Sequence, residues 1–130
     1  MQEIWKDIEG YEGLYQVSNL GKIKSIQYLN RVNNKSYPRN KILKIIINEK
    51  GYLKVDLYKL KKKKRFRIHR LIAQAFIPNP NNFPEINHIN GNKQDNSINN
   101  LEWCTHSYNM KEAYKLGLVT PPKKVSQKNK

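Results

Sequence analysis

Residues 85–116, EINHINGNKQDNSINNLEWCTHSYNMKEAYKL, are the stretch whose pattern decides the fold. It opens with a short apolar strand over 85–89, and LEWC at 101–104 has the pattern of a second short strand. The polar, asparagine-rich residues 90–99 between them form a loop, and 106–116 have the period of a helix. The order strand, loop, strand, helix predicts a β-hairpin folded against a helix.

Polar side chains recur at defined points of this stretch. Asn87 and His88 fall in the first strand, Asn100 precedes the second strand, and Asn109 lies one turn into the helix. A hairpin folded against the helix is expected to bring His88 and Asn109 together across the groove between them. Imidazole suits proton transfer because its ordinary pKa, about 6.5, is near neutral pH.

The residues alone also allow simpler interpretations. A histidine in an apolar strand is more often a core residue than a catalytic one. Asn87 and Asn100 have the residue type that turns favour, in a chain rich in asparagine, and Asn109 fits a solvated helix position. These alternatives stay open without further context.

Further context comes from longer strings of the sequence. Residues 86–114 resemble the ββα-metal core of HNH endonucleases, the His-Me finger, of the phage and intron homing type. The preceding residues 68–93, IHRLIAQAFIPNPNNFPEINHINGNK, resemble the segment that leads into this finger. Residues 8–25, IEGYEGLYQVSNLGKIKS, resemble a NUMOD-type module that precedes such nucleases. The resemblance covers roughly residues 1–117.

The resemblance implies a role for each polar residue of the finger. His88 matches the general base that takes a proton from the attacking water, and Asn100 matches the central asparagine that orients it. Asn87 and Asn109 match the two metal ligands. The implied cofactor is one divalent ion, Mg²⁺ or Mn²⁺. The implied activity is hydrolysis of DNA phosphodiesters to 5′-phosphate and 3′-hydroxyl ends, with nicking of one strand as one form of it.

One position departs from the usual pattern. Asn87 is neutral where many members of the family carry aspartate. We therefore expect the metal site to form fully only when the DNA phosphate is present. The same departure keeps an alternative open, a catalytically weak or silent DNA-binding protein on the HNH fold.

Charge supports a nucleic-acid partner. The 130 residues carry a net charge of +15, which favours a polyanion such as double-stranded DNA. An ordinary basic protein of an AT-rich genome, or an RNA- or ribosome-associated protein, would share this charge. The N-terminus does not have the layout of a signal peptide, and Cys104 is the single cysteine. We expect a cytoplasmic protein with neither a membrane nor an obligate protein partner.

The strongest run of positive charge is KLKKKKRFRIHR, residues 59–70. Read as a hairpin, it places a turn at Lys61–Lys64 and a short strand at 65–68, and a basic ribbon of this kind fits a DNA groove. A solvated charged loop is the alternative. The predicted DNA contacts are Lys61, Lys62, Lys63, Lys64, Arg65, Arg67, His69 and Arg70.

The remaining residues predict the rest of a small α+β fold, in which antiparallel β-hairpins and a short helix precede the finger. The expected elements are a hairpin over 10–25, a loop over 27–40, strands over 42–48 and 52–58, and a helix over 69–76. Inside the finger, Trp103 is expected to pack the hairpin on its helix.

Three regions follow from this pattern. Residues 1–40 form a NUMOD-like module, and residues 41–117 form the nuclease core with its finger at 85–117. Residues 118–130 are expected to be a basic, disordered tail.

Overall fold

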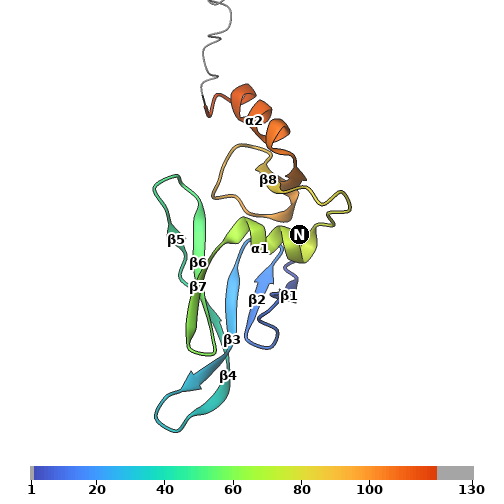
Figure 1. Cartoon of the computed structure of the whole chain (residues 1–130). Helices are drawn as coiled ribbons and strands as arrows, with labels where there is room; N and C mark the ends of the chain where they lie inside the picture. Colours follow the sequence, from blue (N-terminus) through green and yellow to red (C-terminus); the bar gives the residue numbers. More distant parts are fainter. Residues whose placement is uncertain (1, 120–130) are drawn as a thin grey trace, which may run out of the picture.

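The computed structural model describes residues 2–119, which form three antiparallel sheets and two α-helices (Figure 1). The α+β class predicted from the sequence is confirmed. The elements are β1 (Trp5–Asp7), β2 (Tyr15–Ser18), β3 (Ile23–Asn30), β4 (Lys35–Ile42), β5 (Ile46–Ile47), β6 (Leu53–Lys59), β7 (Lys62–Arg67), α1 (Ile68–Phe76), β8 (Glu85–His88), a 3-10 turn (Ile98–Asn100), β9 (Leu101–Cys104) and α2 (His106–Lys115).

The first sheet has the order β1-β2-β3-β4 and contains the predicted N-terminal hairpin. The prediction of a loop over 27–40 was wrong, because β3 and β4 form a long hairpin there. Pro38 is unexpected in a strand, since proline cannot donate to a ladder. It is tolerated because β4 is the edge strand of this sheet, where one side needs no donor.

The second sheet has the order β5-β6-β7 and carries the basic run. The expected strand over 42–48 is reduced to the two residues of β5. The expected turn at Lys61–Lys64 is also shorter: Leu60 and Lys61 both have positive φ, at 52° and 64°, and β7 already begins at Lys62. A two-residue turn with both φ positive matches the twist of the flanking strands, so the hairpin needs no longer loop.

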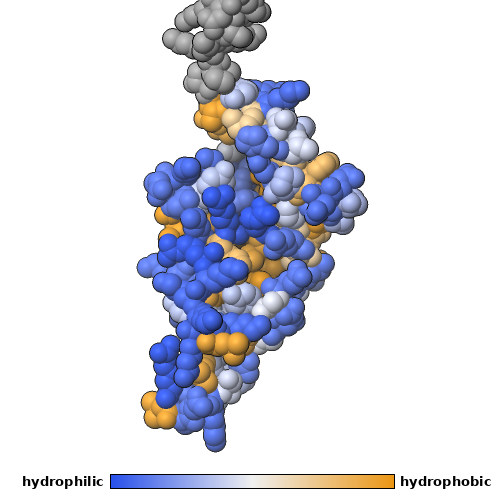
Figure 2. Space-filling model, viewed as in Figure 1, coloured by the Kyte–Doolittle hydropathy of each residue, from blue (hydrophilic) through white to orange (hydrophobic). Residues whose placement is uncertain are grey.

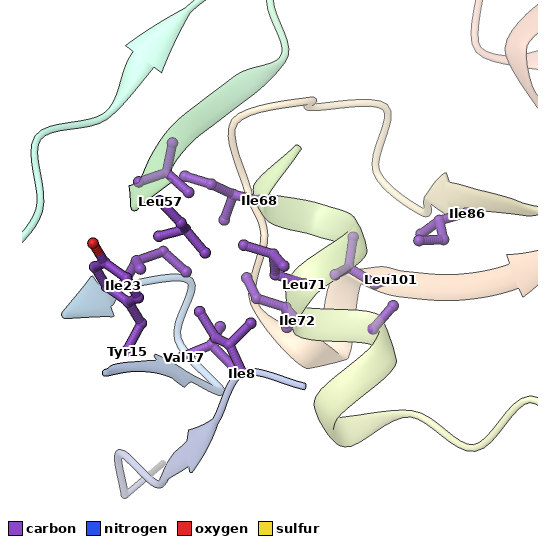
Figure 3. Close-up of a cluster of buried hydrophobic side chains, with 12 residues drawn as sticks. Ile8, Tyr15, Val17, Ile23, Leu57, Ile68, Leu71, Ile72, Ile86 and Leu101 are labelled. Carbon is purple, nitrogen blue, oxygen red and sulfur yellow. The ribbon is translucent and has the colours of Figure 1, made fainter. Parts of the chain in front are cut away.

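Helix α1 lies at the centre of the core (Figure 3). Its buried side chains Leu71 and Ile72 pack between the N-terminal strands and the last hairpin. One apolar cluster thus joins all three sheets, with the buried members Ile8, Tyr15, Val17, Ile23, Val55, Leu57, Ile68, Leu71, Ile72, Ala73, Ile86 and Leu101.

Strands β8 and β9 pair as a two-stranded ribbon, followed by α2, in the order that the sequence predicted. Thr105 caps α2 by accepting a hydrogen bond from Tyr108 N at 3.2 Å. The expected contact of Trp103 with α2 was wrong: its indole N–H donates to Ile77 O, just after α1. Strand alternation explains this, since Trp103 faces the core.

Two further points concern the extent of the described chain and the length of its helices. Most of the predicted basic tail, 120–130, lies outside the described residues. Among residues 2–119, neither helix is long and apolar enough to span a bilayer.

Candidate active site

The β8–β9 ribbon has two chemically different faces. Its register pairs Ile86 with Trp103 and His88 with Leu101, and these four side chains point toward α1; we call this the core face. The alternate residues Glu85, Asn87, Glu102 and Cys104 form the helix face, toward α2. The adjacent residues Asn87 and His88 therefore lie on opposite faces.

On the core face, His88 is buried. It is only 6% exposed, and its Nε2 lies 2.7 Å from Asn96 Oδ1. An amide oxygen only accepts, so Nε2 carries the proton and Nδ1 keeps its lone pair. Burial lowers the pKa of His88, which keeps the ring neutral at pH 7.

His69 lies beside His88, with ring centroids 5.0 Å apart, and stacks on Tyr52. It is 5% exposed, and burial lowers its pKa to about 3. The prediction that His69 contacts DNA from the basic surface is corrected by this placement. The sequence misled because His69 stands between arginines, whereas the first turn of α1 directs it inward.

Asn100 holds the loop between the two strands. Its Oδ1 accepts from Asn90 N at 2.9 Å, and its Nδ2 donates to Asp95 O at 2.9 Å. Its backbone carbonyl also accepts from Ile89 N. These bonds fix both ends of the loop that carries Asn96, the partner of His88.

The N-terminal sheet supports the same loop from behind. The backbone N–H of Ile98 donates to Asn19 O at 3.1 Å. A Cβ on Gly21 would lie 3.5 Å from Asn96, and Gly21 has a φ of +95°. The turn after β2 is therefore in direct contact with the residue that bonds His88.

On the helix face, two carboxylates hold two asparagines. Asn87 Nδ2 donates to Glu102 Oε1, and Asn109 Nδ2 donates to Glu85 Oε1, both at 2.9 Å. His106 Nδ1 donates to the other oxygen of Glu85 at 2.7 Å. The amide of Asn109, followed by His106, keeps the pKa of Glu85 below its usual value.

The structure only partly brings the predicted site residues together. Asn87 and Asn109 are bonded to the carboxylates of the helix face, whereas His88 is bonded to Asn96 and lies beside His69 of α1. In the described part of the chain β8 pairs with β9 alone, which leaves the other edge of β8 free. This unpaired edge borders both His88 and Asn87.

Sequence reasoning missed three residues of the site. Glu85 and Glu102 could have been identified from the two-residue period of the strands, because each shares a face with Asn87 once the register is known. Asn96 gave no signal, since it is one of several asparagines in a loop.

The possible metal ligands on the helix face are mostly the oxygens of carboxylates and of side-chain amides. Within residues 2–119, no three His, Cys, Asp or Glu side chains converge in a way that could hold a metal ion. A cation at this face would therefore depend on the amide oxygens of Asn87 and Asn109.

The basic residues are divided between the two faces of the β6–β7 hairpin. Lys63, Arg65 and Arg67 share one face. Their cross-strand partners on the same face are Tyr58, Asp56 and Lys54, in that order. Arg70 lies in α1 and donates to Pro84 O. Hydrophilic side chains cover this flank of the molecule (Figure 2).

Some of these cations are already partnered within the chain. Arg65 forms a two-pronged ion pair with Asp56, at 2.8 and 3.2 Å. Arg67 lies over the ring of Tyr52, and Lys93 lies over the same ring. Lys61, Lys62, Lys63 and Lys64 are exposed.

Two parts of the chain match known families. Residues 66–111 match the HNH endonuclease family, and residues 3–58 match the NUMOD4 motif. The resemblance seen in the sequence is therefore confirmed for both parts.

Individual relatives extend the comparison. DNA endonuclease I-HmuI of Bacillus phage SP01 is 37% identical over 119 residues, which are 92% of this chain and 62% of that protein. An uncharacterised HNH endonuclease of Acanthamoeba polyphaga mimivirus is 52% identical over 71 residues, 55% of this chain and 22% of the relative. The chain thus spans less than two thirds of either relative.

A solved structure shows the same fold. It describes DNA binding and cleavage by the HNH homing endonuclease I-HmuI, and it matches with a TM-score of 0.73 at 35% identity. The match covers 97% of this chain and 64% of the solved one.

Proposed function

We propose that this chain, which belongs to the HNH endonuclease family through residues 66–111, is a divalent-metal-dependent endonuclease acting on double-stranded DNA. One observation carries the proposal. His88 is buried and neutral, and its tautomer is fixed by Asn96. It follows Asn87 in β8, and one edge of that strand pairs with no other strand among the described residues. A base and a metal ligand on neighbouring residues can flank one phosphate at that edge.

His88 is the proposed general base. Asn96 accepts from Nε2, so the lone pair of Nδ1 is the one available to an attacking water. The low pKa means that no proton has to be removed before the reaction at neutral pH. Asn100 is proposed to keep this geometry by bracing the loop that holds Asn96.

Asn87 and Asn109 are the proposed metal ligands. Hard amide oxygens suit Mg²⁺ or Mn²⁺, and few protein ligands suit an ion that keeps water and a substrate phosphate in its shell. The carboxylates of Glu85 and Glu102 on the same face make the potential there more negative. A bound cation would offset the charge on the phosphate and on the leaving 3′ oxygen.

The proposed reaction is hydrolysis of a phosphodiester by water. A water oxygen forms a bond to phosphorus while its proton passes to Nδ1 of His88. The bond from phosphorus to the 3′ oxygen breaks, and that oxygen takes a proton from solvent. The products are a 5′-phosphate and a 3′-hydroxyl. A chain with one such site cuts one strand in each event, which makes nicking the expected outcome.

The proposed DNA surface is the outer side of the β6–β7 hairpin. Lys61, Lys62 and Lys63 are exposed around the tight turn, and Arg67 follows on the same strand. Charges of this kind bind phosphates without reading sequence, and each one lost reduces the salt dependence of binding.

The test is nicking of supercoiled plasmid with Mg²⁺ or Mn²⁺. The parent chain is expected to convert supercoiled to open-circular DNA, and EDTA to stop it. His88→Ala is expected to lower the rate by at least 100-fold, the lower range for a lost general base. Lys115→Ala, at the far end of α2, is the control. Equal rates in the parent and His88→Ala would reject His88 as the base.

A second candidate is a DNA-binding protein with weak or no catalysis on the same fold. It is favoured by the neutral Asn87 and by the absence of three converging acidic or imidazole ligands in residues 2–119. Asn87→Asp separates the two: increased nicking indicates a working metal site. An inert parent that the substitution does not activate, while DNA binding persists, indicates the binding protein.

A further inference from the structure

Each asparagine proposed as a metal ligand is held through its amide nitrogen by a carboxylate. Asn109 Nδ2 lies 2.9 Å from Glu85 Oε1, and Asn87 Nδ2 lies 2.9 Å from Glu102 Oε1. We infer that Glu85 and Glu102 are positioning residues, which turn both carboxamides so that their oxygens stay available to the cation. This inference rests on the proposed function, because it assigns a role at the same site.

The orientation follows from the chemistry of the partners. An ionised carboxylate can only accept, so the group that each asparagine turns toward it has to be the NH₂. The oxygen of each amide then points away from the glutamate. An amide without such a partner can rotate, and one of its two flat orientations presents nitrogen, which a hard cation does not bind. An aspartate ligand needs no such help, since its two oxygens are equivalent.

The placement of the two glutamates fits positioning better than direct ligation. Both oxygens of Glu85 are bonded to α2, one to Asn109 and the other to His106. Glu85 therefore connects the start of β8 to the first turns of α2 and fixes the spacing between them. Glu102 is the cross-strand partner of Asn87 in the ladder, so its reach to that amide is set by the register.

The two glutamates also explain how neutral ligands can suffice. The chain uses asparagine at both ligand positions, which removes the charge that would draw a cation. The carboxylates supply negative charge one layer behind the amides. Groups that orient metal ligands from behind typically change metal affinity by 10- to 100-fold.

The test measures metal binding separately from cleavage. Mn²⁺ binding to the full chain is followed by the loss of the free-Mn²⁺ electron paramagnetic resonance signal, and the Mn²⁺ concentration for half-maximal plasmid nicking gives a second reading. Glu85→Met and Glu102→Met, which remove the acceptor, are each expected to weaken Mn²⁺ binding by about 10-fold or more. Glu112→Gln, on α2 but holding neither asparagine, is the charge-matched control and is expected to change it little.

A conservative variant separates orientation from charge. Glu85→Gln keeps an acceptor oxygen for Asn109 and loses the charge, so it is expected to retain more Mn²⁺ affinity than Glu85→Met. If the two variants are equally weak, charge alone explains the effect and the positioning role is overturned.

A double substitution separates positioning from direct ligation. In an Asn109→Asp background either oxygen can bind the cation, so adding Glu85→Met is expected to cost clearly less affinity than it does in the parent, with only the loss of the glutamate's charge remaining. If Glu85 were itself a metal ligand, its removal would weaken Mn²⁺ binding in both backgrounds. An equal loss of Mn²⁺ affinity in both would therefore overturn the inference. Thermal unfolding by circular dichroism checks that each variant is folded.

Failure of the inference can be told from failure of the proposed function. If Asn109→Ala changes neither Mn²⁺ reading, the proposed metal site itself is wrong. If Asn109→Ala weakens binding but Glu85→Met and Glu102→Met do not, the site stands and the positioning role alone is rejected.

Discussion

The two faces of the β8–β9 ribbon differ in their chemistry. The core face buries Ile86 and Leu101 against α1, with His88 as its polar member. The helix face carries Glu85, Asn87 and Glu102 and bonds to α2 through polar groups. Only one strand thickness separates them.

This difference shows how adjacent residues can have opposite chemistry. Because strand side chains alternate, Asn87 and His88 receive separate environments without any separation in sequence. Burial keeps the imidazole neutral, whereas two carboxylates hold the asparagines of the other face. If both groups shared one face, the carboxylates would instead raise the pKa of the histidine.

The largest expected effect tests the energetic side of this comparison. Leu101→Ala removes a side chain that is 4% exposed and leaves a cavity, which is expected to cost about 2–5 kcal/mol of stability. Glu102→Ala, its neighbour on the helix face, loses one hydrogen bond to a buried amide and is expected to cost about 1 kcal/mol. Urea unfolding followed by circular dichroism gives both values. Equal losses of unfolding free energy would mean that the two faces contribute alike to stability.

A second prediction separates the faces by kinetics. Asn96→Ala removes the partner of His88 Nε2 and leaves that buried N–H unpaired. The nicking rate at saturating metal is expected to fall by about 10- to 100-fold, the equivalent of 1–3 kcal/mol for a buried unpaired group. The Mn²⁺ concentration for half-maximal rate is expected to stay unchanged, because Asn96 belongs to the core-face side. A raised Mn²⁺ requirement would contradict the division.

The third prediction concerns the pH dependence of stability. The pKa of His69 is about 3 in the folded chain and near 6.5 when unfolded, so between these values only the unfolded chain binds the proton. Stability is therefore full above pH 6.5 and falls as the pH is lowered toward 3. From pH 7 to 5 this histidine is expected to cost about 2 kcal/mol.

The control for this prediction is His69→Leu, which keeps the site apolar and cannot titrate. The parent is expected to lose about 2 kcal/mol more than this variant between pH 7 and 5, in urea unfolding at each pH. The same loss in both proteins would show that His69 is protonated in the folded chain or does not remain buried.

The fold could be predicted from sequence where the pattern is local. The order of the finger elements follows from hydrophobic period and residue type, and it is found. The β3–β4 hairpin was missed because Pro38 is acceptable only at a sheet edge, and the sequence does not show which strand is the edge. The shortened strand at 46–47 was missed for the related reason that β-branched residues also fill irregular segments.

The site could be predicted only in part, for a geometric reason. His88, Asn100 and Asn109 were found because a motif contains them. The partners that control them, Asn96, Glu85 and Glu102, depend on register and on the packing of α1 and α2. Period-two alternation alone already implied that Asn87 and His88 face apart.

The smallest expected effect extends the same rule of faces to the β6–β7 hairpin. Lys63 and Arg65 share its outer face, but Asp56 pairs with Arg65 across the ladder, which holds the pKa of Asp56 low. Lys63→Ala is expected to reduce the salt slope of duplex DNA binding by about 0.9, the value for one phosphate contact.

Arg65→Ala is expected to reduce that slope by clearly less, because much of its charge is already offset. Asp56→Asn frees Arg65 and is expected to tighten DNA binding by a few-fold at low salt, since an exposed ion pair of this kind contributes about 0–1 kcal/mol. Fluorescence anisotropy with a labelled duplex over a series of salt concentrations measures all three variants. If Arg65→Ala changes the slope as much as Lys63→Ala, the ion pair with Asp56 opens on DNA, and a cross-strand pairing read from the free chain does not decide which cations reach the phosphates.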